Sequence, residues 1–134
     1  MLRFIFSIAQ RWRLAIWLIY LGILATLSLI AGNDLPQLAV FAGFDKLVHS
    51  CLYFGLTLLG CWTLHAELKN SRIILIALFC LLWGLVMEIS QLEMKLGRAF
   101  EWTDEVANGI GILVGIGLYL MIFIHYKKSL KTND

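Results

Sequence analysis

Eight polar or charged side chains lie near the ends of three apolar segments, and their types could bind a ligand or transfer protons. They are Asp45, Lys46, His49, Glu88, Gln91, Arg98, Asp104 and Asn108. Lysine and arginine can hold a phosphate or a carboxylate, arginine with two parallel hydrogen bonds. Histidine beside a carboxylate can transfer protons near neutral pH. The set predicts either an anion-binding site or an acid–base site with His49, Glu88 and Asp104 as catalytic candidates.

The spacing of these residues places them on shared helix faces. Side chains three or four positions apart are neighbours on a helix. The pairs with this spacing are Asp45 with His49, Glu88 with Gln91, and Asp104 with Asn108. A charge at the centre of a membrane helix costs about 2.5–3.5 kcal/mol on insertion scales. We therefore expect Glu88 to face Lys46, His49 or Arg98 and not lipid.

Four apolar runs must position these groups. A bilayer core is about 30 Å thick, so a spanning helix needs roughly 20 apolar residues. The runs cover residues 14–31, 47–66, 73–94 and 105–126. Backbone amides in lipid need hydrogen bonds within their own segment, which makes each run a helix. We predict an all-α fold, an integral membrane four-helix bundle with its polar cluster between the second, third and fourth helices, and one domain over residues 1–134.

Basic residues set the predicted orientation, because cytoplasmic loops carry an excess of lysine and arginine. Eight of the eleven lie before the first run, between the second and third, or after the fourth. The remaining three are Lys46, Lys95 and Arg98. Both termini are therefore predicted to be cytoplasmic, with the polar cluster facing outward. The net charge of +2 reflects this anchoring and does not predict nucleic-acid binding.

Two further features leave alternatives open. Residues 1–13 alternate arginines with apolar side chains, which predicts a short helix in the membrane interface or a basic tail. Gly111 and Gly115 form a small-residue stripe that lets two helices approach closely. The stripe could join two copies of the chain in a homo-oligomer or pack within one chain. Internal packing is favoured, because the same face carries Asn108.

The ordered motifs resemble the VanZ-like family of membrane proteins, named for a teicoplanin-resistance protein. The family pattern is D-K-x-x-H, E-x-x-Q, G-R followed by an aromatic residue, and D-x-x-x-N-x-x-G. The matching residues are Asp45, Lys46, His49, Glu88, Gln91, Gly97, Arg98, Phe100, Asp104, Asn108 and Gly111. The resemblance covers about residues 45–117. It implies a multi-pass protein of the bacterial cytoplasmic (inner) membrane with a role connected to the cell envelope.

Four functions remain open at this point. A binding or accessory factor would hold a lipid-linked cell-wall precursor, a glycopeptide or another anionic envelope ligand at Lys46 and Arg98. The resemblance motivates that ligand class, whereas the residues motivate only an anion. A structural protein would use the charges as an ion-pair network between helix ends.

The other two functions use the buried charges chemically. An intramembrane enzyme would use His49, Glu88 and Asp104 for acid–base chemistry, and the same residues could ligate a metal. No motif typical of a metalloenzyme is present, so we expect no metal and no cofactor. A proton-coupled transporter would use Glu88.

Overall fold

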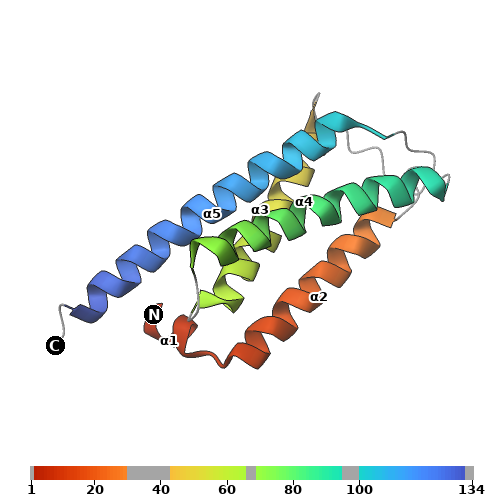
Figure 1. Cartoon of the computed structure of the whole chain (residues 1–134). Helices are drawn as coiled ribbons and strands as arrows, with labels where there is room; N and C mark the ends of the chain where they lie inside the picture. The colour runs from red at the N-terminus through yellow and green to blue at the C-terminus, as the bar shows by residue number, and fades with distance from the viewer. Residues whose placement is uncertain (1, 30–42, 66–68, 95–99, 132–134) are drawn as a thin grey trace.

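The computed structural model describes residues 2–29, 43–65, 69–94 and 100–131, which form helices and no strand. The helices are α1 (Leu2–Ser7), α2 (Gln10–Leu29), α3 (Phe44–Thr63), α4 (Asn70–Glu93) and α5 (Trp102–Lys131). The long helices alternate in direction, and the start of α1 lies at the same end of the molecule as the end of α5 (Figure 1). The all-α prediction is confirmed.

Three of the described helices are long and apolar enough to cross a membrane: α2, α4 and α5. Many of their large apolar side chains are on the outside of the structure, including Ile19, Leu82, Leu113 and Met121. A surface of this kind is unfavourable in water, but lipid chains are as apolar as these side chains. The composition and surface of these helices therefore fit a lipid bilayer.

α3 differs from the other long helices. Its 20 residues are enough to span a bilayer. It is nevertheless not one of the three described helices that are both long and apolar enough to cross a membrane. Polar residues occur in its first turns and again at Thr57, which is completely buried. α3 packs against α2, α4 and α5, so much of its surface contacts protein and does not need to be apolar. Membrane crossing by this segment stays a prediction.

α3 and α5 share the most extensive helix contact, and two glycines of α5 make it possible. A Cβ atom at Gly115 would lie 2.9 Å from the carbonyl oxygen of Phe54, and one at Gly111 would collide with the carbonyl oxygen of Ser50. The stripe thus packs within the chain, as favoured from the sequence. A homo-oligomer formed through these glycines would first have to open this contact.

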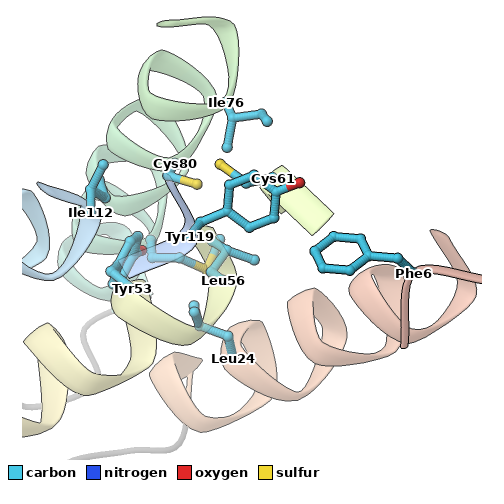
Figure 2. Packing of buried hydrophobic residues seen from close by; sticks show 10 residues of the cluster. Phe6, Leu24, Tyr53, Leu56, Cys61, Ile76, Cys80, Ile112 and Tyr119 are labelled. Atoms are coloured by element: carbon cyan, nitrogen blue, oxygen red, sulfur yellow. The ribbon is translucent and has the colours of Figure 1, made fainter. Parts of the chain in front are cut away.

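The apolar core lies between the long helices and includes Tyr53, Leu56, Cys80 and Tyr119 (Figure 2). α1 covers one end of it. The Phe6 ring stacks on Tyr126 with ring centroids 4.3 Å apart. The N-terminal segment therefore contains a helix that folds against the rest of the chain.

α2 begins at Gln10, earlier than the predicted start at residue 14. Arg13, one of the basic residues counted before the first apolar run, lies in this added turn and is only 4% exposed. Its Nη1 donates to the carbonyl oxygen of Trp62 at 2.6 Å and also contacts His65. These contacts connect the start of α2 to the end of α3. The ends of α5 likewise extend past residues 105–126, because hydropathy does not detect the polar ends of a helix.

Candidate functional site

Lys46 lies among three carboxylates at the start of α3. Its Nζ is 2.7 Å from Asp45 Oδ2, 2.5 Å from Glu101 Oε2 and 2.5 Å from Asp104 Oδ1. The ammonium therefore connects the first turn of α3 to the first turn of α5 and to the residue that precedes α5. Its positive charge is already opposed by these carboxylates, which weakens the expectation that Lys46 alone would hold an anion.

Glu101 lies just before α5 and belongs to this group of charges. The hydrogen bond from Lys46 is the main cause that lowers the pKa of the Glu101 carboxyl. Its side chain is 52% exposed, so solvent screening limits how much the pair can stabilise the fold. The sequence alone left open whether Glu101 belongs to the polar cluster or to the solvated rim. The structure places its carboxylate against Lys46.

A chain of hydrogen bonds fixes the ring of His49. Asn108 is 1% exposed, and its Nδ2 donates to Glu105 Oε2 at 3.0 Å. The amide oxygen of Asn108 then faces His49, with Oδ1 3.1 Å from Nδ1. An amide oxygen can only accept, so Nδ1 carries a proton in this arrangement. In the neutral ring, Nε2 keeps its lone pair, and it lies 3.8 Å from Asp104 Oδ2.

The side chain of Glu88, on α4, lies near His49 and Asp104. Its side chain is 2% exposed. One oxygen of Glu88, one ring nitrogen of His49 and one oxygen of Asp104 all lie within 4.8 Å of one another. The three side chains come from three helices: α4, α3 and α5. The structure thus brings Glu88 beside His49, one of the partners expected from the sequence.

Gly84 makes room for these polar groups on α4. A Cβ atom there would lie 2.6 Å from Glu105 Oε2, 2.8 Å from Asn108 Nδ2 and 3.2 Å from the Tyr53 hydroxyl. A bare backbone at this position lets the carboxylate and the amide lie directly against the helix. Glu105 was not among the predicted site residues, although its position three residues before Asn108 on the same helix face was an available signal.

Of the remaining predicted site residues, Gln91 bonds elsewhere and Arg98 is not described. Gln91 is 3% exposed, and its Nε2 donates to the carbonyl oxygen of Ser28 at 2.8 Å. It therefore connects α4 to the end of α2. Arg98 lies outside the described residues, so the predicted pairing of Lys46 with Arg98 around an anion is untested.

The described part of the site carries more negative than positive charge. Lys46 is its one lysine or arginine among the described residues, and His49 adds a charge only when protonated. The carboxylates are Asp45, Glu88, Glu101, Asp104 and Glu105. The described residues thus supply one lysine against five carboxylates, and the charge of Arg98 is not counted in this balance.

An open apolar groove lies beside the polar group, between α3 and α5. Its volume is about 150 Å³, and its lining residues are Ser50, Cys51, Phe54, Ile110, Gly111 and Val114. The Ser50 hydroxyl donates to the carbonyl oxygen of Ala107 at 2.8 Å, so this polar group is satisfied and only apolar surface lines the groove. Ser50 directly follows His49, so the groove lies at the same level of α3 as the polar group, although consecutive side chains of a helix point in different directions.

Apolar helices that meet around buried ionisable side chains define a helical membrane protein whose polar groups face protein and not lipid. A family model described as VanZ/LLP1 matches residues 2–124. The match covers most of the chain, which therefore belongs to the VanZ/LLP1 family, and the resemblance seen in the sequence motifs is confirmed. No curated protein and no solved structure matches the chain.

Proposed function

We propose that this chain is a multi-pass protein of the bacterial cytoplasmic membrane that binds a lipid-linked ligand of the cell envelope and acts as an accessory factor there. One observation carries the proposal: polar side chains from α3, α4 and α5 converge at the level of α3 where an apolar groove lies between α3 and α5. A polar site at the same level as an apolar groove suits a ligand that has a polar head and a hydrocarbon chain.

The buried charge supports a function for the polar site. Ionisable side chains within membrane-spanning helices are costly, and they usually mark sites of binding or proton transfer. Glu88 is 2% exposed on α4, a helix whose apolarity is the highest of the three candidate spans. Packing alone does not require a glutamate here, because an apolar side chain of similar size would cost less.

The groove supports a lipid as the ligand. Ile110 and Val114 of its lining are 54% and 56% exposed, so the groove opens toward the surroundings of the helices. A hydrocarbon chain in the groove would bring its head group to the level of His49 and Asn108. Lys46 and Arg98 are the cations that would contact a phosphate of the head group. The distribution of basic residues supports an outward-facing site with both termini in the cytoplasm.

A purely structural role is the second candidate, and Lys46 favours it. Its contacts with Glu101 and Asp104 join segments that are far apart in the sequence. An ion-pair network that only holds α3 and α5 together would need no ligand. Under this alternative, variants of the site would lose stability, and groove variants would behave like the wild type.

Native mass spectrometry of the protein in a mild detergent tests the proposal. We expect the wild type to retain a lipid of discrete mass. Val114→Trp fills the groove and should abolish retention. Leu113→Trp is the matched control, because Leu113 is the neighbouring residue, is 71% exposed and does not line the groove. Absence of a discrete lipid from the wild type, or equal retention by Val114→Trp, would contradict the proposal.

A further inference from the structure

We propose that His49, Glu88 and Asp104 form a binding site for a divalent first-row transition metal ion, such as Zn²⁺ or Mn²⁺. This site goes beyond the proposed lipid binding and does not depend on it. It also differs from the expectation based on sequence motifs, which was that the chain binds no metal. Four features of the site lead to the proposal.

The first feature is geometry. Metal–ligand bonds from histidine nitrogen or carboxylate oxygen are about 2.0–2.2 Å long, so two ligand atoms of one ion lie at most about 4.4 Å apart. His49 Nε2 and Asp104 Oδ2 are 3.8 Å apart. One carboxylate oxygen each from Glu88 and Asp104 and one ring nitrogen of His49 lie within 4.8 Å of one another. Small side-chain rotations would bring all three atoms to coordination distance.

The second feature is the orientation of the His49 ring. Metal-binding histidines usually donate their second ring N–H to a carbonyl or carboxylate, which fixes the tautomer and the ring position. Here Nδ1 faces the amide oxygen of Asn108, and Glu105 holds that amide in turn. The lone pair of Nε2 therefore points toward Asp104. This hydrogen-bond chain is the kind of outer support that metal sites use.

The third feature is the position of Lys46. Its ammonium is 2.5 Å from Asp104 Oδ1, whereas Oδ2 lies on the side of His49. Lys46 therefore contacts one oxygen of Asp104, and the other oxygen is the one nearer to His49. A second acidic group, Asp45 with Glu101 and Asp104, does not carry the same proposal, because Lys46 already contacts all three of its carboxylates.

The fourth feature is the chemistry of the three side chains. In the neutral ring of His49 the Nε2 lone pair can bind a metal ion, and so can the carboxylate oxygens of Glu88 and Asp104. Glu88 is 2% exposed, and the side chains of His49 and Asp104 are 17% and 14% exposed. One imidazole with two carboxylates suits Zn²⁺ or Mn²⁺ better than Ca²⁺ or Mg²⁺, which prefer oxygen ligands only.

Three protein ligands would leave at least one coordination position open. A water molecule or an oxygen of a phosphate could occupy that position. The ion would add positive charge to a site in which Lys46 is the one lysine or arginine among the described residues.

Metal analysis of the full-length protein, with any affinity tag removed, tests the inference. The protein is equilibrated with Zn²⁺ or Mn²⁺, desalted, and measured by inductively coupled plasma mass spectrometry. We expect about one ion per chain. His49→Gln and Asp104→Asn, which keep the side-chain size, should lower the metal affinity by more than 100-fold. Glu93→Gln is the control, because Glu93 is an exposed carboxylate of α4 outside the group.

Cobalt substitution gives a readout that does not need the variants to fold. Co²⁺ bound by one nitrogen and oxygens should produce visible absorption bands in the wild type, and Zn²⁺ should displace them. Wild-type protein that binds no metal and shows no such bands would overturn the inference. Metal bound equally well by folded His49→Gln and Asp104→Asn would also overturn it. A lipid found without metal would refute the metal site and leave the proposed function intact.

Discussion

Lys46 and Asp104 begin two different helices and meet as an ion pair, with Lys46 Nζ 2.5 Å from Asp104 Oδ1. The other oxygen of Asp104 lies 3.8 Å from His49 Nε2. A single aspartate thus connects the exposed charges around Lys46 to the buried group around Glu88. Changes to the outer charges should therefore alter the buried site, and several expectations depend on this connection.

Removal of the lysine should destabilise the contact between α3 and α5. Lys46→Ala leaves three carboxylates close together without the ammonium between them. Because Asp45 and Glu101 are more than half exposed, we expect a loss on the order of 1 kcal/mol in unfolding free energy. Thermal unfolding in detergent measures this change. Lys69→Ala is the control, because Lys69 is exposed and lies before α4. Equal melting temperatures for Lys46→Ala and the wild type would show that the ion pairs contribute nothing.

The contribution of Glu101 should depend on pH. Its carboxyl pKa is lowered by the Lys46 hydrogen bond, so the folded state favours the charged form. The resulting stability is present above the ordinary carboxyl pKa and disappears as the pH falls through the lowered value. Glu101→Gln should therefore lower the melting temperature slightly at pH 7 and not at strongly acid pH. Because Glu101 is half exposed, the effect should be below about 1 kcal/mol and should shrink with added salt. A difference that persists at low pH would have another cause.

The glycines of α5 should differ sharply in their tolerance of a methyl group. Gly111→Ala places a Cβ against the carbonyl of Ser50, and such overpacking costs about 1–3 kcal/mol. Gly109→Ala is the matched control on the same helix, because nothing lies within 4 Å of its added Cβ. The control should be neutral or stabilising, because alanine favours helix over glycine by up to about 1 kcal/mol. Equal effects of the two changes in thermal unfolding would argue against the close contact of α3 with α5.

Gly84→Ala should affect the metal site through its outer support. The added methyl group would displace the Glu105 carboxylate and the Asn108 amide, and His49 would lose its fixed orientation. Loss of such support typically lowers metal affinity about 10–100-fold. Titration with Zn²⁺ measures the change. Gly22→Ala on α2 is the control, because its added Cβ meets nothing within 4 Å. Unchanged affinity in Gly84→Ala would mean that the hydrogen-bond chain does not orient the ligand.

The sequence predicts well what depends on one helix at a time. Long apolar runs located α2, α4 and α5, and the three- and four-residue spacing correctly indicated which side chains share a face. It could not indicate which neighbour each face meets. Gln91 lies on the face of Glu88, as expected, but it bonds to the end of α2, because a helix face is wide enough to touch two partners.

The sequence did not predict the roles of residues whose contacts involve several helices. From the sequence, Glu105 is an ordinary acidic residue in the first turn of a helix, where its charge interacts favourably with the helix dipole. Only the approach of α4 at Gly84 shows that its carboxylate supports Asn108. From the sequence, Arg13 is one of the basic residues that flank the first apolar run. It is buried beside Trp62 because the end of α3 lies against the start of α2.

The close contact of α3 with α5 has a consequence for biosynthesis. α3 is not one of the candidate membrane spans among the described helices, and its most extensive contact is with α5. A nascent chain that ends after α4 lacks this contact. Gly111 and Gly115 of α5 can pack against Ser50 and Phe54 only after α5 has emerged from the ribosome. Assembly of the polar site must therefore be one of the last steps in the synthesis of the chain, and products truncated before α5 should be substrates for membrane quality-control proteases.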